Sequence, residues 1–186
     1  PYTYWGSSTD TKPSSHQYGV SELDEALMVG TDKYDPSGDE PTSRYGVSAR
    51  SVEYSEDRSW VVLDLRPEAS WHDGKPNTSA DVAFSYRTLL KEGHPLYRTN
   101  LQEVQRVDSL GPLRIRFVFK RAGNPLLILR LGEMPVLPKH YWQNRDLKAT
   151  TFQPPLGSGP YRITEVQPGR RLVVDPLNNL LVKDLA

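Results

Sequence analysis

The residues best able to do chemistry in this 186-residue chain are four histidines, His16, His72, His94 and His140. No two of them stand four residues apart, which is the helical spacing of a zinc site. His72 precedes Asp73, and a His–Asp pair can orient a general base, yet no serine near it lies in a Gly-x-Ser-x-Gly turn. The histidines therefore favour neither a metal site nor a hydrolase, and we interpret the pair as structural.

Two glycine-containing turns have some features of phosphate-binding loops. Gly74-Lys75 lacks the upstream glycine and the following Ser or Thr of a phosphate loop. Gly157-Ser158-Gly159 lacks a third glycine and precedes a predicted strand instead of a helix. The triplet Asn77-Thr78-Ser79 matches a glycosylation acceptor, but Thr78 is better interpreted as a helix cap. We expect no enzymatic activity, no cofactor and no metal.

Composition narrows the class of protein further. The chain carries 23 basic and 23 acidic residues, so its formal net charge is zero and no electrostatically driven binding of nucleic acid is expected. It contains no cysteine, which excludes disulfides and thiolate metal sites but leaves an oxidising compartment possible. The densest apolar stretch, 125–131, is too short to span a bilayer and is interrupted by Arg130. A chain of this length can bury its own core as one domain or two small lobes.

The elements that would position these residues mix strands and helices. β-forming residues over 49–54 and 60–65, joined by the polar stretch 55–58, predict a hairpin. Thr78 as N-cap, with Asp81 three residues later, predicts a helix from Ser79 to Glu92 that ends before Gly93.

Further strands are predicted over 104–109 and 113–120, pairing antiparallel, and over 161–166 and 171–175. Short helices are predicted over 21–28 and 138–144, whereas the periodicity of the apolar segment 124–131 does not distinguish a helix from a strand.

Several of these segments contain motifs in a specific order. They are the string from Ala49 to Trp60, Trp71-His72-Asp73-Gly74-Lys75-Pro76, Thr78-Ser79-Ala80-Asp81-Val82-Ala83-Phe84-Ser85-Tyr86, Leu137-Pro138-Lys139-His140-Tyr141-Trp142 and Pro155-Leu156-Gly157-Ser158-Gly159-Pro160-Tyr161. In order and spacing they resemble family 5 of the extracellular solute-binding proteins. Leu27-Met28-Val29-Gly30 and Gly93-His94-Pro95-x-Tyr97 look most like its branch for oligopeptides and antibiotics of the microcin C type.

The resemblance implies the function and location of the chain. It implies a mixed α+β fold, the smaller lobe of a type II periplasmic-binding-protein fold with partial strands of the larger lobe. It also implies a periplasmic receptor that binds oligopeptides or peptide-like compounds and delivers them to the ABC permease subunits of the inner membrane. Export to the periplasm would use a signal peptide that this sequence does not contain.

The same resemblance implies a domain division. Residues 1–30 would be a remnant of the larger lobe, 31–156 the smaller lobe, and 157–186 the crossover and the start of the larger lobe's continuation. Family members are longer, so the chain is expected to be an N-terminal fragment. Strand edges left without partners would favour self-association of such a fragment.

Roles for single residues follow from their motif positions. Trp71, Asp73 and Gly74 are expected to build the loop before the helix, where Trp71 buries its ring and Gly74 occupies a turn that a β-carbon would hinder. Gly157, Gly159 and Pro160 lie in the implied crossover between lobes and are candidate hinge residues. Tyr97 and Arg98, after the helix, are the candidate ligand contacts.

Other functions stay open at this stage. The same family could bind a non-peptide solute, such as an oligosaccharide, an opine or a metal chelate, and the deciding residues would lie in the other lobe. A stand-alone interaction module acting through its exposed edges is a further alternative.

Overall fold

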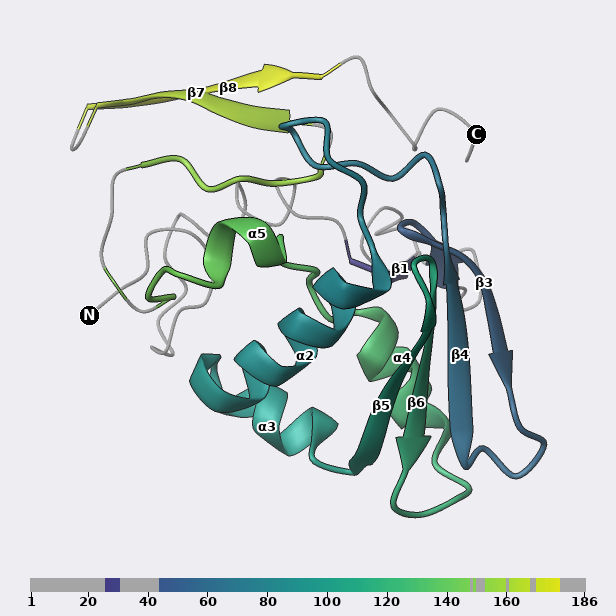
Figure 1. The fold of residues 1–186 in the computed structure, drawn as a ribbon. Coiled ribbons are helices and arrows are strands. Elements are labelled where there is room, and N and C mark those ends of the chain that lie inside the picture. The colour runs from purple at the N-terminus through teal and green to yellow at the C-terminus, as the bar shows by residue number, and fades with distance from the viewer. Residues whose placement is uncertain are drawn as a thin grey trace, which may run out of the picture.

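The computed structural model describes residues 26–30, 44–147, 149, 153–159, 161–167 and 170–177. Its largest sheet is antiparallel, with four strands in the order β3 (Ala49–Tyr54), β4 (Trp60–Leu65), β6 (Arg114–Phe119) and β5 (Val104–Gly111). Helices lie against one face of this sheet, and a separate hairpin lies beyond its end (Figure 1). The mixed α and β class predicted from the sequence is confirmed.

The hairpin of β3 and β4 forms where the sequence predicts it. Its strands pair antiparallel, with Val52 opposite Leu63 and Tyr54 opposite Val61. The connecting turn contains Arg58, whose φ of 56° is the positive value that a tight turn requires. The predicted pair over 104–109 and 113–120 is also confirmed, as β5 and β6.

Four helices accompany the sheet: α2 (Ser79–Glu92), α3 (Pro95–Leu101), α4 (Pro125–Gly132) and α5 (Lys139–Trp142). The first and last match the predicted helices closely. α4 resolves the ambiguous apolar segment: Pro125 occupies its first turn, and the Asn124 side chain caps it by accepting a hydrogen bond from the N–H of Leu126 at 3.1 Å.

The core lies between the sheet and the helices. β4 and β6 turn alternate side chains inward, and Val61, Leu63, Ile115 and Phe117 are fully buried. The Tyr86 ring of α2 meets Phe117 edge to face, with centroids 5.7 Å apart. Apolar residues of α4 and the indole of Trp71 complete the same cluster, so sheet, helices and the loop before α2 form one packed unit, here called the sheet–helix unit.

The helix predicted over 21–28 is wrong in its described part. Met28–Gly30 forms a short strand, β1, which pairs antiparallel with β2 (Arg44–Gly46), and Ala26 bridges to Pro135. A β-carbon on Gly132 would lie 2.8 Å from the Met28 sulfur, so α4 packs closely on β1. Packing against distant segments therefore decides the structure of 26–30, and Ser21 lies outside the described residues.

The second hairpin, β7 (Tyr161–Gln167) with β8 (Arg171–Pro176), also forms where predicted. Its register places Ile163 opposite Val174 and Val166 opposite Leu172, so these four apolar side chains share one face. Ile163 is buried, whereas Leu172 and Val174 are 48% and 39% exposed. The predicted turn Pro168-Gly169 lies outside the described residues.

None of the helices in the described part of the chain combines the length and the apolar character needed to cross a bilayer.

Candidate functional site

The sequence motifs converge at one end of the sheet–helix unit. Four segments meet there: the loop 66–78, the N-terminal half of α2, the segment 137–142 that contains α5, and the crossover 153–159. We call this region the junction. Its hydrogen bonds join residues up to 87 positions apart in the sequence. Four of the five sequence motifs described above therefore lie close together in the junction.

Asp81 fastens α5 to the start of α2. Its Oδ2 accepts hydrogen bonds from the Thr78 N–H at 2.9 Å and the Thr78 hydroxyl at 2.6 Å. Its Oδ1 accepts the backbone N–H of Lys139 at 2.8 Å. The residue is 5% exposed, so these donors replace the water that a buried carboxylate loses. The predicted cap at Thr78 is confirmed, and Asp81 additionally holds a second helix.

One helical turn further along α2, Ser85 holds the same segment. Its fully buried hydroxyl donates to the Asp81 carbonyl at 2.7 Å and accepts the N–H of Leu137 at 2.7 Å. Sequence reasoning assigned Ser85 no role, although it closes the Asp-Val-x-Phe-Ser motif. A small hydroxyl residue inside an otherwise apolar helical face is the signal that could have identified it.

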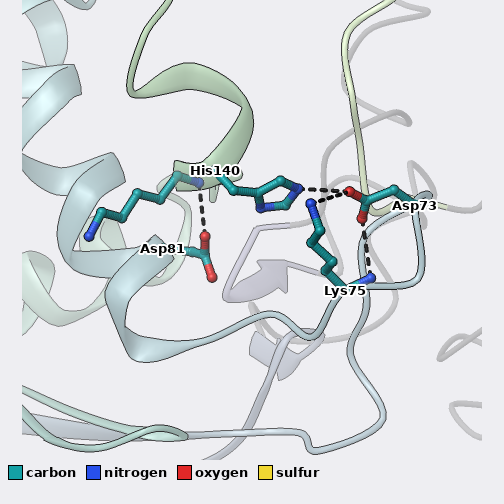
Figure 2. Close-up of polar contacts among 5 residues, drawn as sticks. Asp73, Lys75, Asp81 and His140 are labelled. Carbon is teal, nitrogen blue, oxygen red and sulfur yellow. Dashed lines mark hydrogen bonds and ion pairs between the residues drawn. The ribbon is translucent and has the colours of Figure 1, made fainter.

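Asp73 links the loop 66–78 to α5, as Figure 2 shows. Its Oδ2 lies 2.8 Å from His140 Nε2 and 3.3 Å from the Lys75 ammonium, while its Oδ1 accepts the Lys75 N–H at 3.2 Å. Partial burial raises the pKa of Asp73, but the Lys75 and His140 donors outweigh it and leave the pKa below its ordinary value. The carboxylate is therefore held ionised between two donors.

His72 binds the crossover. Its backbone N–H donates to the Gly157 carbonyl at 2.9 Å, and its Nε2 lies 2.9 Å from the Gly159 carbonyl. Burial lowers the pKa of His72, and Arg162 of β7 lowers it further, against an opposing effect of the Gly159 bond. The imidazole is thus favoured in its neutral form, and because a carbonyl only accepts, Nε2 carries the proton.

α5 and the residues that follow it add two further contacts to the crossover. The Tyr141 hydroxyl donates to the Pro154 carbonyl at 3.3 Å, and Arg145 reaches the Gln153 side chain at 3.4 Å. The Arg145 guanidinium also lies 4.1 Å from the centre of the Tyr141 ring. The crossover is therefore held from both the loop and α5.

The loop residues behave largely as predicted. Trp71 is 2% exposed within the core. Gly74 adopts φ +81°, yet no atom lies within 4 Å of an added β-carbon, so the backbone conformation and not a clash demands glycine. Asn77 is 1% exposed, and neither amide atom has a hydrogen-bond partner among the described residues; its burial argues against a glycosylation site.

Of the remaining predicted residues, two lie on α3, two lie in the crossover, and one lies outside the described residues. Tyr97 is half-buried against the core and Arg98 is exposed on α3, which Figure 1 shows at the opposite end of the unit from the β7–β8 hairpin. Gly157 and Gly159 are buried in the crossover, and Pro160 lies outside the described residues. Ligand contact and hinge roles stay predictions.

The polar side chains of the junction bond to one another and to backbone groups. Within the described residues, no three His, Asp or Glu side chains gather as metal ligands. Both junction histidines are hydrogen-bonded, His72 to the Gly159 carbonyl and His140 to the Asp73 carboxylate. The arrangement is suited to holding segments of chain in fixed relation.

Comparison with known proteins gives a family match. Bacterial extracellular solute-binding proteins, family 5 (middle part), match residues 45–179. A binding protein of Brucella melitensis is 39% identical over 152 residues, covering 80% of this chain and 24% of the relative. Agrobacterium fabrum YejA, named a probable peptide-binding protein, is 32% identical over 174 residues, covering 90% of this chain and 27% of the relative. The chain thus spans about a quarter of the length of these relatives.

Solved structures agree on the fold. The oligopeptide-binding protein AppA of Bacillus subtilis, in complex with a nonapeptide, superposes with a TM-score of 0.73 at 19% identity, covering 91% of this chain and 33% of AppA. NikZ of Campylobacter jejuni, in complex with Ni(L-His), gives 0.74 at 24% identity, covering 88% and 31%. At these identities the likeness concerns the fold alone, and it matches the fold that the sequence predicts.

Proposed function

Because the chain belongs to the family 5 bacterial extracellular solute-binding proteins, we propose that it forms part of an ABC-importer receptor for oligopeptides or peptide-like compounds. The observation that carries this proposal is the family match over 45–179, together with a relative named a probable peptide-binding protein that aligns over 90% of the chain. Microcin-type peptides are one class of ligand within this proposal.

The receptor would act by binding and delivery, without catalysis. It would reside in the periplasm and hand its ligand to permease subunits of the inner membrane. The side chains of the chain most able to act as a base are its histidines. His72 bonds to the Gly159 carbonyl and His140 bonds to Asp73, which supports a structural role for both. Neutral net charge fits recognition of mixed peptides better than recognition of nucleic acid.

Peptide recognition in such a receptor would rely on backbone hydrogen bonds and on water-filled side-chain pockets. Within this chain we propose Tyr97 and Arg98 as ligand contacts. Arg98 is exposed on α3, and its Nε donates to the Leu90 carbonyl at 3.4 Å. The groups that pair with peptide termini would lie in the larger lobe.

A non-peptide ligand is the second candidate. NikZ, which shares this fold, was solved with a nickel–histidine complex, so the architecture also accommodates a metal chelate. For the present chain an oligosaccharide, an opine or a chelate would require different cleft residues but the same junction.

A thermal-shift screen of the full-length protein tests the ligand class. A ligand that closes two lobes stabilises the folded state by mass action, about 2.7 kcal/mol at a hundredfold excess over Kd. We expect a saturable rise in Tm with mixed short peptides, and little change with sugars or nickel–histidine. A rise with those compounds and none with peptides would retain the family and replace the ligand. As a control, the 186-residue chain should show no rise with peptides, which would place the site across the lobes.

We also propose that the 186-residue chain self-associates when it is isolated. Tyr161, Leu172 and Val174 present exposed apolar surface on one face of the β7–β8 hairpin, at 37%, 48% and 39% exposure. Light scattering at high concentration should show dimers, and Leu172→Glu should reduce them. Asp175→Ser, a substitution on the opposite face, serves as the matched control. A monodisperse monomer would refute the self-association.

A further inference from the structure

The crossover 153–159 is attached to the rest of the described structure near both of its ends. α5 holds its beginning, through Tyr141 to the Pro154 carbonyl at 3.3 Å. The loop 66–78 holds its end, where His72 reaches the carbonyls of Gly157 and Gly159, each at 2.9 Å. Both glycines are buried, and neither has the positive φ found at Gly74 and Gly123. A segment so attached is not free to bend at those glycines.

Beyond Gly159 the chain enters β7, and the attachment changes. β7 pairs with β8 alone among the described strands, and Figure 1 shows this hairpin beyond the crossover, away from the four-stranded sheet. His72 therefore makes the last hydrogen bond that the described structure shows between the loop and the crossover before the chain leaves the sheet–helix unit.

We infer that His72 is a positioning residue, which fastens the crossover through Gly159 to the sheet–helix unit and so places lobe movement C-terminal to Gly159. This inference rests on the proposed receptor function, since it concerns how two lobes move. It revises the role of Gly157 and Gly159 from hinge residues to fixed anchor points. Burial and the neutral imidazole fit this role, because a neutral ring with its proton on Nε2 presents one donor to one carbonyl.

Substitutions at position 72 can distinguish the effect of the N–H donor from the effect of the side-chain volume. His72→Phe keeps a ring and removes the donor, and His72→Asn keeps an amide too short to reach Gly159. His72→Gln returns an N–H near the position of Nε2. His140→Phe is the matched control, because it makes the same substitution within the junction but removes the contact with Asp73 and not one with the crossover.

Hydrogen–deuterium exchange of the ligand-free, full-length protein measures the fastening. The amide of residue 72, which donates to the Gly157 carbonyl, and the amides of the buried Gly157 and Gly159 exchange when the crossover opens locally. The net loss of one hydrogen bond raises an open population about two- to tenfold, so His72→Phe should speed their exchange by that factor. His72→Asn should do the same, His72→Gln should restore protection, and His140→Phe should leave these amides unchanged.

Three outcomes would overturn the inference: unchanged exchange in His72→Asn, no rescue by His72→Gln, or equal acceleration by His140→Phe. If His72→Phe does not fold, the comparison of Asn with Gln decides the question. Peptide is added only afterwards, to wild-type protein. Failure to bind any peptide would refute the proposed ligand while the exchange result stands, and altered binding with unchanged exchange would refute the role of His72 alone.

Discussion

Replacing Asp81 with asparagine tests whether the junction depends on a buried charge. The carboxylate accepts three hydrogen bonds, two from Thr78 and one from the N–H of Lys139, at 2.6 to 2.9 Å. Asparagine has nearly the same shape, but one of its two terminal atoms is an NH₂ that cannot accept a hydrogen bond. In the variant, the NH₂ group must therefore face either the Thr78 donors or the N–H of Lys139.

The less costly choice is to turn the NH₂ toward Lys139, because only one bond is lost there. A hydrogen bond to a charged group contributes about 1.5 to 3 kcal/mol, and the Lys139 N–H would also stay unpaired. The two bonds to Thr78 would weaken, since the remaining acceptor is neutral. We expect Asp81→Asn to lower the free energy of unfolding by about 2 kcal/mol, and Asp81→Ala by about 3 kcal/mol through the additional loss of the cap.

Urea denaturation followed by far-UV circular dichroism measures both variants, and an unchanged m value keeps the comparison valid. Glu68→Gln is the control, because it also neutralises a carboxylate, at an exposed position of the loop 66–78 that precedes α2. It should change the stability by less than about 0.5 kcal/mol. If Asp81→Asn costs no more than Glu68→Gln, the carboxylate does not hold α5 and the reasoning is refuted.

Three further predictions concern the same loop. Gly74→Ala should cost about 1 to 2 kcal/mol because Gly74 adopts φ +81°, whereas Gly111→Ala, with open space and no positive φ, should be near neutral by urea denaturation. Asn77→Leu should raise the Tm, since an amide that is buried and unpaired on both atoms costs about 1 to 3 kcal/mol; an unchanged or lower Tm would contradict this. Because burial lowers the pKa of His72 below 6.5, its contribution to stability is complete above pH 6.5 and declines as the pH falls below that value. His72→Gln should remove this part of the pH dependence of unfolding.

Local signals were sufficient to predict the hairpin of β3 and β4 and the helix α2. Alternating β-formers around a polar turn carry their own pairing partner, and Thr78 with Asp81 marks a helix start from nearby residues alone. The same is true of β7 and β8. In each case the decisive contacts join residues that are close in the sequence.

The sequence could not predict elements whose partners are distant. β1 and β2 are three residues long, too short for a periodic signal, and Gly132 of α4 packs against Met28. β4 pairs with β6, although the chain between these two strands contains α2, α3 and β5. The contact between Asp73 and His140 spans 67 positions, and no property of either residue alone indicates it.

The geometry of the junction explains why two of its motifs have their particular composition. Asp81 and Ser85 are four residues apart on α2, which places their acceptors about 6 Å apart along the helix axis. Leu137 and Lys139 are two residues apart in an extended segment, about 6.6 Å, so their N–H groups align with the two acceptors in reverse order. Pro138 between them has no N–H to leave unpaired, and its φ of −65° and ψ of 108° keep the segment extended.

Docking this segment also fixes where α5 begins. Lys139 is its first residue, so the Asp81 bond sets the helix start, and the next two residues, His140 and Tyr141, are then directed to Asp73 and to the crossover. A serine or alanine at position 138 would add a backbone N–H at a buried position and would no longer restrict φ. The Leu-Pro-Lys-His-Tyr motif therefore links α2 to the crossover. Leu137 and Lys139 bond to two residues one turn apart on α2, and Tyr141 then bonds to the crossover.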